Sequence, residues 1–179
     1  AEWLLCDATG LSRVELYVNF DRPLAPEELD RMHAGIERRA AGEPLQYVTG
    51  EMPFRHIVLR CEKGVLIPRP ETEVLVDAAL EGVDAAARAA GGPTRVLEIG
   101  TGTGCISLSV ASERPGTRVV ATDLSPVAVD LATRNREALG LADAVDIVQT
   151  DLAADVDPAL MGTFSVLVSN PPYIPTSVL

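Results

Sequence analysis

The second half of the chain alternates short apolar runs with stretches in which apolar residues recur at helical spacing. Apolar runs at 95–99, 118–122, 145–149 and 164–169 have the length of buried strands, and helical periodicity follows the first two. Strands that alternate with helices predict an α/β fold, a Rossmann-like parallel sheet with right-handed crossovers. Because ligands of such sheets bind beyond the carboxyl ends of the strands, residues that follow each run are candidates for a site.

The first part of the chain has helical patterns and no strand-like alternation. Ser12 with Glu15 forms a capping box, which predicts a helix that starts at Ser12. Pro26 followed by Glu27 and Glu28 predicts the start of another, with Pro at its first position and acids in its first turn.

From Tyr47 the period changes to that of extended chain. Residues 54–59 predict one strand, Lys63-Gly64 predicts a turn, and 65–67 predict the return strand of a hairpin. We therefore expect a helical domain over 1–46, of a form common in domains that dock a partner, a β-hairpin linker over 47–68, and an α/β domain over 69–179.

A glycine-rich loop follows the run that ends in Glu98-Ile99. Gly100, Gly102 and Gly104 let the backbone turn tightly and approach a ligand without a Cβ in the way. A P-loop would need a Lys after its last glycine, and the dinucleotide pattern G-x-G-x-x-G fails in both registers. The run instead fits E-x-G-x-G-x-G, which resembles the first motif of S-adenosylmethionine (SAM) dependent methyltransferases; the alternative is a turn without a ligand.

Three acids stand at the predicted strand ends. Asp123 can accept hydrogen bonds from both ribose hydroxyls of a nucleoside, or it can cap the helix that follows. Asp151, followed by Leu152, would lie near the adenine edge, or it is a turn residue. Glu98 places a negative charge where the ammonium of a methionine moiety could sit, or it orders the loop by accepting backbone N–H bonds.

Asn170-Pro171-Pro172-Tyr173 follows the last predicted strand. The prolines fix the chain and leave their carbonyl groups as acceptors. Asn170 offers an amide with donor and acceptor faces, and Tyr173 offers a flat ring. Together they can hold a planar NH₂ group, although a rigid turn after a strand is the simpler alternative.

The net charge and the numbers of cysteine and histidine residues argue against several kinds of substrate and site. Fifteen Lys and Arg against 26 Asp and Glu give a formal net charge of −11, which argues against a nucleic-acid substrate. The three cysteines are far apart and the two histidines lie near no acidic or cysteine cluster, so we expect no metal site and a cytoplasmic location. No apolar run reaches membrane length, so we expect no membrane partner.

These motifs together resemble a known family. The glycine loop and Asn170–Tyr173, with Arg69-Pro70-Glu71-Thr72-Glu73 and the upstream Gln46–Gly50, are similar to the HemK/PrmC family of release factor glutamine N5-methyltransferases. The resemblance covers nearly the whole chain. It implies SAM as methyl donor, S-adenosylhomocysteine (SAH) as product, and the Gln of the Gly-Gly-Gln loop of a peptide chain release factor as substrate.

Carried over residue by residue, the resemblance implies two sets of site residues. Asn170 and Tyr173 would be catalytic, and they would bind the substrate together with Pro171 and Pro172. Leu152 stands where relatives often carry an aromatic residue. The cofactor would contact Gly100, Thr101, Gly102, Thr103, Gly104, Asp123 and Asn170, and the positions at the strand ends add Glu98, Asp151 and Leu152 to the cofactor candidates.

Three other functions share part of this pattern. A ribosomal-protein glutamine methyltransferase shares Asn-Pro-Pro-Tyr but carries a different sequence at 69–73. A DNA adenine-N6 methyltransferase would need a basic surface for base flipping, which a net charge of −11 does not suggest. A non-enzymatic adaptor with this fold would not need Asn170 and Tyr173.

The number of strands sets one further expectation. Methyltransferases of the class that the chain resembles have a seven-stranded sheet, whereas four strands are predicted after Arg95. We therefore expect a C-terminally incomplete sheet with an exposed apolar edge on the strand that ends at Ser169.

Overall fold

The computed structural model describes residues 1–171. They belong to two compact units, one from Ala1 to Glu51 and the other beginning at Met52. Among the described residues, no helix combines the length and the apolar character that crossing a membrane requires.

The first unit consists of short helices. The predicted capping box is present, since the Ser12 and Glu15 side chains each bond the other residue's backbone N–H. The helix predicted at Pro26 is also present. The helices of this unit are α1 (Glu2–Thr9), α2 (Arg13–Val18), α3 (Pro26–Ala40) and α4 (Leu45–Thr49).

Helix α4 corrects the expectation of extended chain from Tyr47. Arg38 of α3 donates to the carbonyl oxygens of Tyr47 and Val48 at 2.9 and 3.2 Å. It also pairs with Glu43 at 2.7 Å. These contacts hold the segment as one helical turn, which the local apolar pattern could not predict.

The second unit begins with a hairpin of β1 (Glu51–Phe54) and β2 (Ile57–Arg60). The predicted hairpin is therefore present, but its predicted return strand at 65–67 is wrong, because those residues have no strand structure. The chain reverses at Arg55-His56, ahead of the turn at Lys63-Gly64.

The early reversal is held by Arg55, which takes a left-handed backbone conformation with φ 49°. Its guanidinium binds both carboxylate oxygens of Glu113 at 2.6 and 2.9 Å, and it pairs with Asp77 at 2.7 Å. Partners on other elements, one of them 58 positions away in sequence, thus decide where this hairpin turns.

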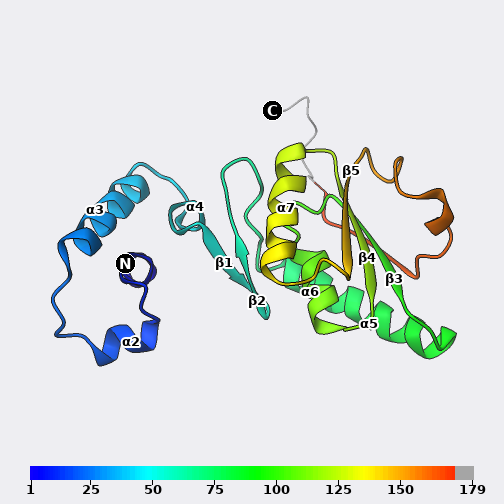
Figure 1. The fold of residues 1–179 in the computed structure, drawn as a ribbon, viewed down its shortest axis with the longest axis horizontal. Coiled ribbons are helices and arrows are strands. Elements are labelled where there is room, and N and C mark those ends of the chain that lie inside the picture. The colour runs from blue at the N-terminus through cyan, green and yellow to red at the C-terminus, as the bar shows by residue number, and fades with distance from the viewer. Residues whose placement is uncertain (172–179) are drawn as a thin grey trace. The chain divides into compact units, whose positions relative to one another are not determined.

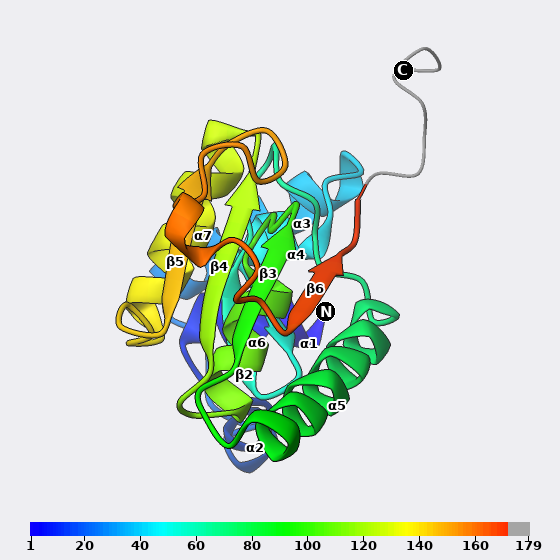
Figure 2. The ribbon, with the colours of Figure 1, turned by 90° about the vertical axis from the view of Figure 1, so that its right-hand side faces the viewer.

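The rest of the second unit is an α/β structure, as predicted. Its four strands are parallel and lie side by side in the order β5-β4-β3-β6 (Figure 2). The strands are β3 (Arg95–Ile99), β4 (Arg118–Asp123), β5 (Val145–Gln149) and β6 (Val166–Ser169). The helices are α5 (Thr72–Ala90), α6 (Cys105–Glu113), α7 (Pro126–Ala138) and a 3₁₀ turn, η1 (Pro158–Leu160).

The sheet is covered differently on its two faces. Helices α5, α6 and α7 lie on one side, and the segment between β5 and β6 lies on the other (Figure 1). Val96 and Val119 belong to the large core that includes α5 and α6, whereas the alternate residues Leu97 and Val120 pack with Val156. Both faces of the central strands are therefore buried, as their continuous apolar runs suggest.

The order of the strands places a switch point beside β3. From β3 the chain moves outward to β4 and β5, and then returns to the opposite side of β3 as β6. Ile99 and Ser169 are register partners, and the Ser169 hydroxyl donates to the Ile99 carbonyl at 2.7 Å. The carboxyl ends of β3 and β6 are therefore adjacent, at the position where open α/β sheets bind ligands.

Candidate functional site

The glycine loop leaves β3 and leads directly into α6. Gly100, Gly102 and Gly104 have φ of 78°, 57° and 84°, a region that favours glycine. A Cβ on Gly104 would lie 2.7 Å from Leu108 Cδ1, so a larger residue there would have to displace the buried Leu108 side chain. Among residues 1–171, a Cβ on Gly100 would meet nothing within 4 Å, so no described side chain covers the outer side of that glycine.

The threonines of the loop point inward. Thr101 and Thr103 are both 2% exposed. Gly100 N and Thr101 N donate to the Thr122 carbonyl of β4 at 2.8 and 2.9 Å. A ligand over this loop would therefore meet the glycine backbone rather than the threonine side chains.

Glu98 orders the loop from beneath. Its side chain is fully buried, and one carboxylate oxygen accepts from the Thr101 hydroxyl at 2.7 Å and from Ser107 N at 3.1 Å. The other oxygen is buried without a hydrogen-bond partner among the described residues. Burial raises the pKa of Glu98 to about 7, although the hydrogen bonds from Thr101 and Ser107 oppose that rise.

Asp123 ends β4 and contacts the loop. One carboxylate oxygen accepts from Gly102 N at 2.9 Å and the other from Ser125 N at 2.9 Å. Ser125 itself caps α7 by accepting from Ala128 N. A carboxylate offers about four acceptor positions, so the half-buried Asp123 can still receive two hydroxyl groups.

Asp151 and Leu152 lie just beyond β5, and both are exposed. Leu152 has φ 52°, a left-handed conformation that costs a non-glycine residue about 1–2 kcal/mol. The turn is stabilised by Thr150, whose hydroxyl donates to Asp155 at 2.8 Å and accepts from its N–H at 3.0 Å. The exposed apolar surface of Leu152 therefore stands on an ordered turn at the carboxyl end of the sheet.

Asn170 follows β6 directly, one position beyond the register pair Ile99 and Ser169. Gly100 and Asn170 are thus the first residues after two paired strand ends at the switch point. Its side-chain NH₂ donates to the Thr72 hydroxyl at 3.2 Å. Pro171 is exposed, and the predicted Pro172 and Tyr173 lie outside the described residues.

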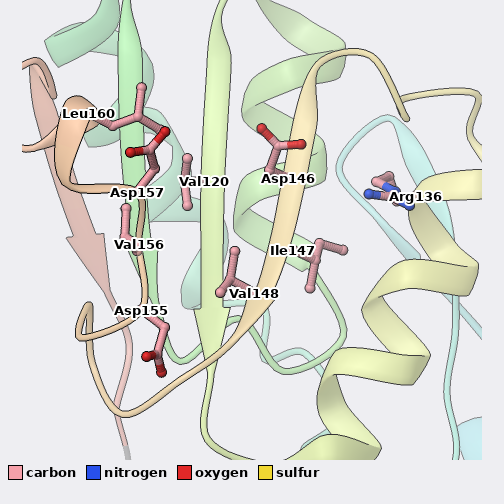
Figure 3. Close-up of a pocket in the computed structure, with 9 residues that line it drawn as sticks. All are labelled: Val120, Arg136, Asp146, Ile147, Val148, Asp155, Val156, Asp157 and Leu160. Atoms are coloured by element: carbon pink, nitrogen blue, oxygen red, sulfur yellow. The ribbon is translucent and has the colours of Figure 1, made fainter.

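One cavity in the described part of the chain lies away from these strand ends. It has a volume of about 420 Å³ and is lined by residues of β4, β5, α7 and the segment around η1 (Figure 3). None of the predicted cofactor residues lines it. The strand ends, rather than this cavity, bring the candidate side chains together.

Two residues of the site were not singled out from the sequence. Thr72 belongs to the Arg69–Glu73 motif, but its contact with Asn170 joins residues 98 positions apart. Asn135 of α7 donates to the carbonyl of Thr103 at 2.8 Å. The only sequence signal for Asn135 is a polar residue among the apolar positions of a helix.

Comparison with known proteins agrees with this architecture. Residues 80–177 match the methyltransferase small domain, and residues 1–50 match the PrmC N-terminal domain. Over 98% of its length the chain is 42% identical to the release factor glutamine methyltransferase of Chlorobaculum tepidum, of which it covers 60%. Over 99% of its length it is 44% identical to that of Geobacter sulfurreducens, of which it covers 58%.

A solved structure shares the fold. The N-terminal domain of human METTL16 in complex with SAH matches with a TM-score of 0.52 and 22% identity, over 66% of this chain and 47% of that one. The chain spans about 60% of the length of the curated relatives it matches. The resemblance drawn from the motifs is confirmed, and the chain belongs to the methyltransferase small domain family.

Proposed function

We propose that this chain transfers a methyl group from SAM to the side-chain amide nitrogen of the Gln in the Gly-Gly-Gln loop of a peptide chain release factor. The observation that carries this proposal is the register pair Ile99 and Ser169, because Gly100 and Asn170 directly follow these two paired strand ends. A loop suited to a nucleoside cofactor and a motif suited to an NH₂ group thus meet at one switch point. The relatives named above are release factor glutamine methyltransferases.

The residues at the strand ends fit a nucleoside cofactor. The open side of Gly100 allows close approach to the backbone, and Asp123 retains acceptor positions for two ribose hydroxyls. Asp151 and Leu152 would contact the adenine from the end of β5. When bound, SAM supplies an electrophilic methyl group, and the residues of the chain orient the acceptor toward it.

The substrate nitrogen needs orientation rather than a strong base. An amide nitrogen is a poor nucleophile because its lone pair is delocalised into the carbonyl group. The sequence offers no histidine or cysteine in a catalytic pattern. We infer that the Asn170 side-chain oxygen and the Pro171 carbonyl accept the two hydrogens of the Gln NH₂, while Tyr173 packs on the amide plane. These acceptors favour the positive charge that develops on the nitrogen.

The direction of the Asn170 amide supports this assignment. Its NH₂ end donates to Thr72 Oγ1. The oxygen is then the end that the proposal assigns to the substrate. Without the bond to Thr72, the Asn170 amide could rotate by half a turn. Its NH₂ group would then face the substrate NH₂, and the two groups cannot bond each other because both are donors.

Partner and compartment follow from the same proposal. The substrate is a release factor, and no nucleic acid or membrane is required as a partner. A cytoplasmic location suits the cysteines, which are free thiols rather than disulfides. The ribosomal-protein glutamine methyltransferase is the second candidate, because its relatives share Asn-Pro-Pro-Tyr.

Mass spectrometry tests the proposal directly. The protein is incubated with SAM and one candidate substrate at a time. The three candidates are a release factor, a ribosomal protein and adenine-containing DNA. We expect a methyl group on the Gly-Gly-Gln glutamine alone. Asn170→Ala should lower turnover about a hundredfold or more, with a smaller loss of SAM affinity. Methylation of either other substrate in preference to release factor would refute the substrate assignment.

A further inference from the structure

Asn135 is a buried amide with an unusual set of partners. It lies in α7 and is 1% exposed. A polar side chain in such a position costs free energy unless its donors and acceptors are paired. The Asn135 oxygen accepts from Arg60 N at 2.8 Å, and its NH₂ donates to the carbonyls of Arg60 at 3.2 Å and Thr103 at 2.8 Å. Both ends of the amide are thus engaged with backbone groups.

The two backbone partners come from different parts of the fold. Arg60 is the last residue of β2, and Asn135 bonds both its N–H and its carbonyl, as a neighbouring strand would. Thr103 belongs to the glycine loop. One side chain therefore joins the hairpin to that loop, across sequence separations of 75 and 32 residues.

The bond to Thr103 fixes the end of the loop. The peptide unit between Thr103 and Gly104 is planar, so holding its carbonyl also holds the Gly104 N–H. That N–H donates to the Thr101 carbonyl at 2.8 Å, and Gly104 is the N-cap of α6. Asn135 therefore restrains the turn that aims the first N–H groups of α6.

Apolar contacts reinforce the same connection. Ala132 lies one helical turn before Asn135, and its Cβ is 3.6 Å from the place where a Gly104 Cβ would stand. Val65, which follows the hairpin, packs with Ala128 and Leu131 of α7. Its Cγ1 is 3.9 Å from the corresponding position on Gly102. Helix α7 thus touches the loop directly and also through the segment after β2.

We propose that Asn135 is a positioning residue: it holds the glycine loop in its cofactor-binding form and ties that form to the hairpin. The part that concerns affinity rests on the proposed cofactor role of the loop. The part that concerns loop geometry does not depend on any ligand. The two parts call for separate measurements on the same variants.

The first measurement is the affinity for SAH, by calorimetry, at a temperature where circular dichroism shows each variant folded. Asn135→Ala removes all three hydrogen bonds. Asn135→Asp keeps the acceptor for Arg60 N but loses both donors. We expect both to bind SAH at least tenfold more weakly than the wild type. Val83→Ala, a buried change in α5, should lower stability without changing the affinity.

The second measurement is hydrogen exchange of single amides. Exchange of Gly104 N–H should be faster in both Asn135 variants than in Val83→Ala. Exchange of Arg60 N–H should be faster in Asn135→Ala and remain slow in Asn135→Asp. A purely structural role would change all these amides in proportion to global stability, as Val83→Ala does.

Each outcome decides the proposal. Wild-type SAH affinity in folded Asn135→Ala, or Gly104 exchange no faster than in Val83→Ala, overturns it. If the wild type itself binds no SAH, the cofactor assignment fails, and Gly104 exchange alone decides whether Asn135 positions the loop.

Discussion

Asp123 is a single residue that serves both the loop and the helix beside it. Its carboxylate holds Gly102 N and Ser125 N, so it orders the loop and the start of α7 at once. Both groups that it orders border the proposed ribose position. The same carboxylate would therefore shape the site and bind the ligand within it.

Asp123→Ala should weaken SAM binding. Loss of a charge-assisted hydrogen bond costs about 1.5–3 kcal/mol, which corresponds to roughly ten- to a hundredfold in affinity. Calorimetry with SAM measures the change. Asp143→Ala, which removes the same charge before the amino end of β5, is the matched control and should bind normally. Equal affinities in both variants would remove Asp123 from the cofactor site.

Glu98 predicts a dependence of stability on pH. Its pKa rises from an ordinary value of 4.5 to about 7, chiefly because it is buried. A raised pKa means that the unfolded chain ionises first. The contribution of Glu98 to the free energy of unfolding is therefore fully present below about pH 4.5 and is lost as the pH rises toward 7. The loss is on the order of 3 kcal/mol, which is the cost of ionising the buried carboxyl group.

Glu98→Gln removes that titration while keeping an oxygen to accept from Thr101 and Ser107. The difference in unfolding free energy between wild type and variant should therefore shift by up to about 3 kcal/mol in favour of the variant between pH 5 and 8. Denaturant unfolding at several pH values measures it. A difference that stays constant with pH would mean that Glu98 ionises normally in the folded protein.

At the scale of elements, local signals succeeded where the deciding contacts are local. The capping box at Ser12 and the Ser125-Pro126 helix start each depend on residues within a few positions of one another. Local signals failed at the return strand of the hairpin and at α4. There, Arg55 and Arg38 fix the backbone through partners on other elements.

The candidate site follows the same division. Strand ends pointed to Asp123 and Asn170, because the carboxyl ends of parallel strands share one edge of the sheet. The roles of Thr72 and Asn135 could not be predicted from the sequence, because their contacts depend on how α5 and α7 pack against that edge. The burial of Glu98 could not be predicted from the sequence either, because it depends on the sheet being covered on both faces.

The contact between α5 and β6 makes a prediction about turnover. Thr72 is 6% exposed, and its hydroxyl accepts from the Asn170 NH₂. Thr72→Val keeps the shape but loses the acceptor, which is worth about 0.5–1.5 kcal/mol, so turnover on release factor should fall by up to roughly tenfold. SAM affinity should stay unchanged, and Thr72→Ser should restore turnover.

Steady-state methyl transfer measures the turnover. The Asn170 side-chain amide resonances give a second readout that does not need activity, and they should shift in Thr72→Val but not in Thr72→Ser. If neither turnover nor these resonances respond to Thr72→Val, Thr72 does not orient Asn170.

At the scale of the whole molecule, two properties oppose each other. Within the described residues β6 pairs with β3 alone, so its other edge carries backbone groups without a partner strand. Leu167 on this strand is 65% exposed. Such an edge favours association between copies. A net charge of −11 opposes association, because like-charged molecules repel one another.

Varying the salt concentration separates association at the β6 edge from charge repulsion between molecules. At an ionic strength of about 0.15 M the Debye length is about 8 Å, so repulsion between whole molecules is largely screened while contacts at the strand edge are not. We therefore expect sedimentation velocity to show self-association that increases with protein concentration and with salt. Leu167→Lys should reduce it by placing a charge on the edge, whereas Val74→Lys, at a similarly exposed position on α5, should not. If the wild-type protein stays monomeric at every concentration and salt level, this edge is protected from association. If the two substitutions have equal effects, the association depends on net charge rather than on the edge.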